Sequence, residues 1–203
     1  MRNLEMLTLN FADCNFLLPN KTQNTENSLF YLKALRYLDI DMSGGIYSHR
    51  ENNGLSIFKA LRTANQLETL KLNLEGLPLS GLEFETLFCS WHERKSLKRL
   101  ELNLRTTLLT EKIIIQLGEA IGRIKHLHSL VINFGKSRSI NIEAISSLGL
   151  DICNCKFLKE LAIIASENVD FNPIYCIAGL TKSLNLQRLK LQMAACIFKK
   201  NTI

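Results

Sequence analysis

One apolar frame recurs seven times along this chain of 203 residues, and it constrains the fold more than any other feature. The frame is Leu-x-x-Leu-x-Leu-x followed by an apolar residue, with Ile, Met, Phe or Ala in some of the later positions. The copies begin at Leu4, Leu35, Leu67, Leu97, Leu127, Leu158 and Leu186. Successive starts are separated by 31, 32, 30, 30, 31 and 28 residues. A period of this kind indicates a stack of repeated supersecondary units.

Each unit changes from a strand pattern to a helix pattern. Inside the frame, apolar and polar residues alternate, which is typical of a half-buried strand. Between frames the apolar residues follow helical spacing. Two such faces are Phe84, Leu87, Phe88 and Trp91, and then Ile113, Ile114, Leu117, Ala120, Ile121 and Ile124. Ser80 and Glu83 have the spacing of a capping box, and Asn172-Pro173 is typical of a helix start.

A second apolar column fixes how the units stack. It lies six residues before the first leucine of copies two to seven and consists of Leu29, Leu61, Trp91, Ile121, Ile152 and Leu180. One strand and one helix cannot bury both of their faces, so neighbouring units must share a continuous core. The sequence therefore predicts parallel strands on one side and helices on the other.

The motif resembles that of the leucine-rich-repeat family, in its ribonuclease-inhibitor-like, helix-backed form, from Leu4 to Met193. The resemblance implies an α/β fold: a right-handed solenoid of about seven strand–helix repeats, with a parallel sheet on the concave side. We expect residues 1–203 to form a single leucine-rich-repeat domain, which could be a fragment of a longer array. The end faces carry no recognisable caps, so flanking repeats or an oligomer would cover them.

The chain departs from the family pattern at one position. Eight residues after the first leucine, where the family usually has Asn or Cys, the residues here are Ala12, Ser43, Glu75, Arg105, Gly135, Ser166 and Ala194. The usual residue ties down the turn after the strand. The sequence leaves open whether this turn is looser or is bonded in another way.

The sequence also bears on the cellular compartment. The first ten residues contain no apolar core of a secretion signal, and no run of about 18 apolar residues occurs, so no membrane-spanning helix is expected. Six cysteines are scattered through a chain too long to need disulfides. We expect a cytoplasmic or nuclear protein with reduced thiols.

Polar side chains between the strand leucines form the predicted binding face. The position after the third frame residue holds Asn10, Asp41, Asn73, Asn103, Asn133, Ile164 and Gln192. These amides could contact a partner, or they could bond to one another along the strands. The family resemblance implies that the concave face binds proteins. The predicted partner-binding residues are Asn10, Asp41, Asn73, Asn103, Asn133, Lys71, Arg99 and Glu101.

Charge distinguishes two kinds of partner. The formal net charge is +6, yet the concave positions carry seven cations and six carboxylates. This balance favours a protein partner with mixed charges of its own. The basic excess lies partly in a column of Lys33, Lys95, Lys125 and Lys156, with Arg62, Arg94 and Arg123 nearby. Such cations complement helix C-termini, and alternatively they form a stripe for nucleic acid or a ribonucleoprotein.

No sequence pattern indicates catalysis or a cofactor. A phosphate-binding glycine loop and a nucleophile elbow are both absent from the sequence. His126 and His128 precede one strand, and Cys153 and Cys155 precede the next, but neither pair has the spacing of common zinc modules. A packed Cys155 and a solvated His128 are the simpler interpretation. We therefore expect no enzyme activity, no cofactor and no metal, and predict a protein-interaction module or scaffold.

Overall fold

The computed structural model describes residues 3–14, 32–45, 53–89, 91, 94–136, 142–167, 173–180 and 185–194. Its seven strands form one parallel sheet in chain order. They are β1 (Met6–Asn10), β2 (Tyr37–Asp41), β3 (Thr69–Asn73), β4 (Arg99–Asn103), β5 (Ser129–Asn133), β6 (Glu160–Ile164) and β7 (Arg188–Gln192). Each strand starts two residues after the first leucine of a frame, which confirms the predicted repeat register.

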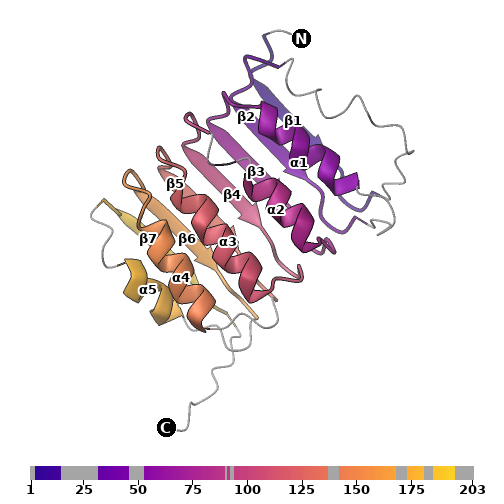
Figure 1. Ribbon diagram of the computed structural model, residues 1–203. Helices are drawn as coiled ribbons and strands as arrows, with labels where there is room; N and C mark the ends of the chain where they lie inside the picture. Colours follow the sequence, from indigo (N-terminus) through magenta and orange to yellow (C-terminus); the bar gives the residue numbers. More distant parts are fainter. Residues whose placement is uncertain are drawn as a thin grey trace, which may run out of the picture.

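Helices cover one face of the sheet (Figure 1). They are α1 (Asn53–Thr63), α2 (Gly81–Cys89), α3 (Glu111–Gly122), α4 (Ile142–Ile152) and α5 (Pro173–Leu180). The predicted α/β leucine-rich-repeat solenoid is confirmed. The segments in which the first and last copies would have their helices lie outside the described residues. We call the uncovered side of the sheet the open face; it is the predicted concave side.

The core lies between the two layers and is built from stacked columns. Strand pairing aligns Leu38, Leu70, Leu100, Leu130 and Leu161, which are all at most 2% exposed. The predicted apolar faces of α2 and α3 are buried as well, and so are Trp91 and Ile124, which lie just past the ends of these helices. Each buried Leu or Ile stabilises the fold by about 1.5–3 kcal/mol relative to exposure. Stacking the frame therefore produces one continuous aliphatic core.

Local signals set the helix starts. At α2, the Ser80 backbone N–H donates to Glu83 Oε2 (2.7 Å) and the Glu83 N–H donates to Ser80 Oγ (3.4 Å), which confirms the capping box. Helix α3 is capped by Thr110, whose hydroxyl accepts from the Ile113 N–H. Pro173 begins α5 as predicted, whereas Asn172 lies outside the described residues. No helix in the described part of the chain is long and apolar enough to cross a membrane.

One cation next to a helix C-terminus is buried. Arg94 is 2% exposed, and its guanidinium donates to the carbonyl oxygens of Leu61 (2.5 Å) and Ala64 (3.3 Å) at the end of α1. Burial lowers the pKa of Arg94 to about 10, so the group remains charged at neutral pH. At Arg94, which lies beside the basic column, this confirms the expectation that cations in this region satisfy the carbonyls that end a helix.

Two neighbouring helices approach so closely that a side chain would not fit between them. A Cβ atom on Gly149 of α4 would lie 2.6 Å from the carbonyl oxygen of Cys176 in α5. Cβ atoms in proteins do not come this close to backbone atoms, so the spacing of α4 and α5 requires glycine at this position. No pattern in the sequence predicts this contact.

Candidate functional site

Strand register places the predicted site residues in straight columns across the open face. Asn10, Asp41, Asn73, Asn103 and Asn133 are successive partners in the parallel ladder, and Ile164 and Gln192 continue the column. Two positions earlier in each strand, a second column holds Thr8, Asp39, Lys71, Glu101, Val131, Ala162 and Lys190. Neighbouring members of a column are about 4.8 Å apart, the usual spacing of strands.

A shallow groove follows these two columns from β2 to β6. It is lined by Asp39, Asp41, Lys71, Leu72, Asn73, Glu101, Leu102, Asn103, Val131, Asn133 and Ile164. Six of the eight predicted partner-binding residues are among them. Asn10 on β1 and Arg99 on β4 do not line the groove, although Arg99 Nε contacts Glu101 Oε1 at 2.6 Å. The structure thus gathers most of the predicted residues around one concavity.

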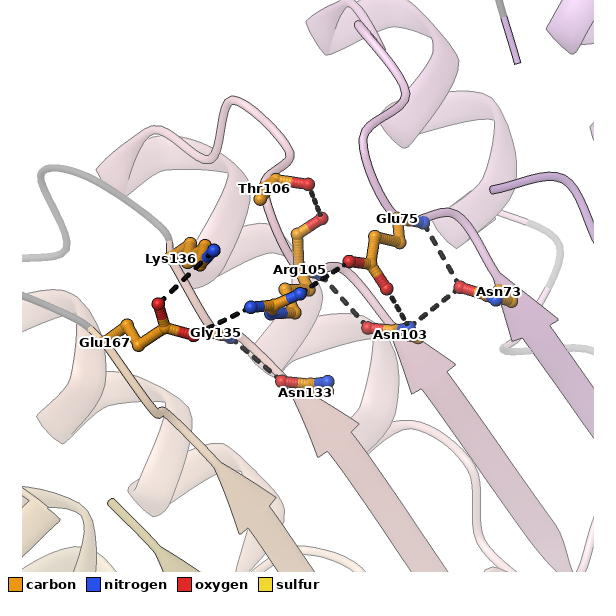
Figure 2. A network of polar contacts seen from close by, with 9 residues as sticks. All are labelled: Asn73, Glu75, Asn103, Arg105, Thr106, Asn133, Gly135, Lys136 and Glu167. Atoms are coloured by element: carbon orange, nitrogen blue, oxygen red, sulfur yellow. Dashed lines mark hydrogen bonds and ion pairs between the residues drawn. The ribbon is translucent and has the colours of Figure 1, made fainter. Parts of the chain in front are cut away.

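The amide column has a structural role that the sequence analysis did not assign. In Asn10, Asp41, Asn73, Asn103 and Asn133 the side-chain oxygen accepts a hydrogen bond from the backbone N–H two residues later (Figure 2 shows the bonds of Asn73, Asn103 and Asn133). The donors are Ala12 (2.9 Å), Ser43 (2.9 Å), Glu75 (3.3 Å), Arg105 (3.2 Å) and Gly135 (2.9 Å). These donors occupy the position where the family usually has Asn or Cys. The turn is therefore bonded in another way, by an Asx turn from the preceding strand residue.

Bonding along the amide column joins Asn103 to Asn73 and Asn73 to Asp41. The Asn103 side-chain N–H donates to Asn73 Oδ1 (2.8 Å) and to Glu75 Oε2 (3.1 Å). The alternative of a self-bonded ladder is thus realised from Asp41 through Asn73 to Asn103. Burial raises the pKa of Asp41, but hydrogen bonds from Ser43 and Asn73 more than offset it, and the net pKa lies below its ordinary value.

Two carboxylates on the open face, those of Glu68 and Glu101, each contact two cations, from neighbouring repeats or from their own strand. Glu68 contacts Arg36 (2.7 Å) and Lys98 (2.8 Å), and these hydrogen bonds lower the pKa of Glu68. Glu101 contacts Lys71 at 3.6 Å as well as Arg99. Burial lowers the pKa of Lys71, but the carboxylate of Glu101 and interactions with Tyr37 raise it by more, so the net shift is upward. These pairings hold opposite charges in fixed positions.

The far end of the groove is aliphatic. Val131 and Ile164 line it, and Ala162 is the register partner of Val131. All three side chains are partly exposed on the open face. These three residues are not among the predicted partner-binding residues, although Ile164 interrupts a column that is otherwise polar. The groove therefore runs from a carboxylate pair, Asp39 and Asp41, to an apolar patch.

A second polar network lies past the strand ends, in the turns (Figure 2). Arg105 contacts Glu75 at 2.9 Å and Glu167 at 2.7 Å, and Lys136 contacts Glu167 at 3.3 Å. Hydrogen bonds from Arg105 lower the pKa of Glu167, although burial opposes this, and bonds from Lys136 add to the lowering. This network ties together turns from four different repeats.

The residues considered for a metal site have other contacts. The rings of His126 and His128 stack on Phe157, with centroid distances of 5.7 Å and 6.1 Å. Cys153 Sγ donates to the carbonyl of Gly179, and Cys155, which is 1% exposed, donates to the carbonyl of Ile121. Cys155 is thus a packed thiol. Among the described residues, no group of three or more His, Cys, Asp or Glu side chains is arranged to hold a metal ion.

Comparison with known proteins gives structural similarity without sequence similarity. No family profile matches the chain, and no curated protein sequence is significantly similar to it. A structure of leiomodin-1 actin-binding site 2 is similar at 13% identity and a TM-score of 0.52, covering 72% of this chain and 81% of that one. An internalin of Listeria monocytogenes aligns at 15% identity and a TM-score of 0.33, covering 84% and 57%. The plant peptide hormone receptor RGFR1, solved with RGF2, aligns at 16% identity and a TM-score of 0.34, covering 95% and 33%. The repeated motif, the one-sided helical layer and the likeness to the leiomodin-1 structure together give this chain the fold of a leucine-rich-repeat solenoid.

Proposed function

We propose that this chain is a non-catalytic protein-interaction module that holds an extended segment of another protein in the groove of its open face. The observation that carries the proposal is the groove itself, which crosses five strands and is lined by acidic, basic, amide and aliphatic side chains. Mixed chemistry on a rigid sheet suits recognition of a polypeptide, which presents the same mixture. The leiomodin-1 segment of similar fold is an actin-binding site, an instance of a protein partner for this architecture.

The groove also defines what the partner segment should contain. Strands β2 to β6 span about 19 Å, which is the length of about six extended residues. A basic side chain would pair with Asp39 and Asp41 at one end. Aliphatic side chains would pack on Val131 and Ile164 at the other end, where little polar surface has to be desolvated.

Two finer assignments belong to the same proposal. The ribonuclease-inhibitor-like subtype is supported by the α-helix that precedes each strand from β3 to β7. A scaffold working in the reducing cytoplasm is supported by the thiols of Cys14, Cys89, Cys155 and Cys176, which form no disulfide within the described residues.

The test places bulk and charge in the groove without breaking the bonds that hold the turns. Substituting Asn73, Asn103 or Asn133 would remove an Asx turn, so the better positions are Val131 and Ala162, which are half-buried on the open face. We would compare the wild-type chain with the double variant Val131→Arg, Ala162→Arg. The matched control is Leu150→Arg, because Leu150 is 47% exposed on α4.

The measurement has two stages: affinity capture from cell extract, then titration calorimetry with the purified partner. We expect the wild-type chain and Leu150→Arg to bind one partner with equal affinity. The double variant, shown by circular dichroism to be folded, should bind at least about tenfold more weakly, the scale of losing one central contact. Equal affinity of the double variant and the wild-type chain would show that the partner does not bind at the open face.

A further inference from the structure

A second groove lies on a different edge of the solenoid, where α3 and α4 end and the chain turns toward β5 and β6. It is lined by Gly122, Arg123, Lys125, His126, Asn154, Lys156 and Phe157. None of these residues lines the groove of the open face. We call this concavity the edge groove.

Aromatic rings form one part of the edge groove. Phe157 is 50% exposed, which is unusual for a large apolar ring. The His126 ring lies 5.7 Å from it with an interplanar angle of 17°, and the His128 ring lies 6.1 Å from it at 15°. Three nearly parallel rings at the surface form a platform of the kind on which a further flat ring stacks.

Cations form the other part. Lys125 and Lys156 are exposed, and within the described residues neither side-chain ammonium group has a hydrogen-bond or ion-pair partner, although the Lys156 carbonyl accepts a hydrogen bond from the Asn185 side chain. Arg123 is paired with Glu119 at 3.6 Å. A second nearby carboxylate is Asp151. Burial and the charge of Glu119 raise its pKa, and the charge of Arg123 offsets only part of this rise. These carboxylates act on Arg123, so the two lysines keep their charge available for a ligand.

We propose that the edge groove binds single-stranded nucleic acid, with a base stacked on Phe157 and phosphates paired with Lys125 and Lys156. Helix dipoles explain why cations gather where α3 and α4 end. They do not explain a half-exposed phenylalanine stacked beside them. An acidic protein segment would need the lysines but not a flat exposed ring, whereas every nucleobase has a face that stacks on one. The site is independent of the open face.

The experiment is fluorescence anisotropy with a labelled twelve-nucleotide uridine RNA, at about 50 mM and about 200 mM salt, where phosphate contacts weaken steeply. Phe157→Leu keeps an apolar side chain and removes the flat ring. The double variant Lys125→Gln, Lys156→Gln removes both proposed phosphate contacts. Its matched control, Arg62→Gln with Lys112→Gln, removes two exposed cations that lie outside the edge groove.

We expect the wild-type chain and the control to bind equally. The affinity of Phe157→Leu for the RNA should be at least about fivefold lower, which is the lower end of the loss expected for one stacked base. The lysine variant should lower the slope of log affinity against log salt by about 1.4, because each phosphate contact to a single strand contributes about 0.7. Circular dichroism would show that each variant is folded.

Several results would overturn the proposal. One is no binding to the RNA at about 50 mM salt, and another is an equal loss in the control, which would indicate diffuse charge. A duplex of equal length that binds as tightly would exclude base stacking, since its bases are already paired. Poly-glutamate that displaces the RNA at equal charge would assign the groove to an acidic protein instead.

Discussion

The guanidinium of Arg105 donates a hydrogen bond to the carboxylate of Glu167 at 2.7 Å, although the two residues are 62 positions apart. Gly135 occupies the corresponding position in the repeat between them and has no side chain to block the path (Figure 2). A Cβ atom on Gly135 would lie 3.3 Å from Arg105 Cδ, 3.1 Å from Asn133 Oδ1 and 3.2 Å from the Ser166 carbonyl oxygen. The network in the turns thus depends on the absence of a side chain.

Gly135→Ala should therefore destabilise the fold by about 1 kcal/mol, the lower range for overpacking a tight site. The backbone at Gly135 has no positive φ, so the effect would come from contact rather than from backbone strain. Gly81→Ala is the control, because nothing lies within 4 Å of a Cβ at that position. Urea unfolding measures both. A loss as large in Gly81→Ala would show that the contacts at Gly135 are not responsible.

The same position of six described turns has a left-handed backbone. Nine residues after the first leucine, φ lies between 56° and 74° in six repeats. The residues are Asp13, Gly44, Gly76, Thr106, Lys136 and Glu167. The backbone N–H of each donates to the carbonyl of the next turn, for example Thr106 to Gly135 at 2.9 Å. A β-branched residue is the least suited to this conformation.

Thr106→Gly should raise the free energy of unfolding by about 0.5–1 kcal/mol, because relief of the left-handed penalty exceeds the entropy cost of glycine. Gly76→Ala should lower it by about 1 kcal/mol for the same reason. Thermal unfolding of both variants checks the pair. If Thr106→Gly unfolds at a lower temperature, the hydrogen bond from the Thr106 hydroxyl to the Arg105 carbonyl outweighs the strain.

Asp41 should make stability depend on pH in acid. Its pKa in the folded chain lies below the ordinary value of 3.8, because hydrogen bonds from Ser43 and Asn73 overcome the effect of burial. The stabilisation is thus fully present above the ordinary pKa and is lost as the pH falls through the lower, folded value. Asparagine fills this column on four of the other strands. Asp41→Asn should keep the turn and reduce the loss of stability on acidification.

Denaturant unfolding between pH 5 and pH 3 measures this effect. We expect the free energies of unfolding of the wild-type chain and of Asp41→Asn to differ less at pH 3 than at pH 5. Parallel pH profiles would mean that other carboxylates, and not Asp41, carry the dependence.

The cysteines should differ in reactivity. Burial raises the pKa of Cys155 and of Cys176 to about 12, and Cys153 adds to both shifts. At pH 8 only about one such thiol in ten thousand is ionised, and the thiolate is the nucleophile. Cys14 and Cys89 are exposed. Iodoacetamide should alkylate Cys14 and Cys89 at least about tenfold faster than the buried pair.

Peptide mass spectrometry after timed quenching measures each site. Repeating the reaction in urea should make the rates similar, because unfolding removes the burial. Fast labelling of Cys155 in the folded chain would contradict the packing of α3 and α4 around it.

The sequence predicted the fold well because the fold depends on apolar periodicity. The frame of four apolar positions placed all seven strands, and the column that contains Trp91 and Ile121 placed the helices. The capping box of Ser80 and Glu83 was predictable because both partners lie within one helical turn. Such features are local or repeated, so one sequence is enough to show them.

Other features depend on contacts between repeats, which no single unit displays. The left-handed position holds glycine in two repeats and Asp, Thr, Lys or Glu in four, so composition did not reveal it. The close approach at Gly149 depends on the spacing of α4 and α5. The aliphatic end of the groove was missed because Val131 and Ile164 look like ordinary strand residues until the register places them on the open face.

The most direct test of the central claim, a partner held in the open-face groove, is photo-crosslinking from inside it. A benzoylphenylalanine introduced at Val131 would lie in the groove, and one at Leu150 would lie on the exposed side of α4 as the control. After irradiation with the purified partner, we predict a covalent complex from position 131 and none from position 150. The crosslinked peptide should contain a basic residue within about six positions of aliphatic ones. Crosslinking from position 150 alone would contradict the account, because the partner would then contact the helices and not the sheet.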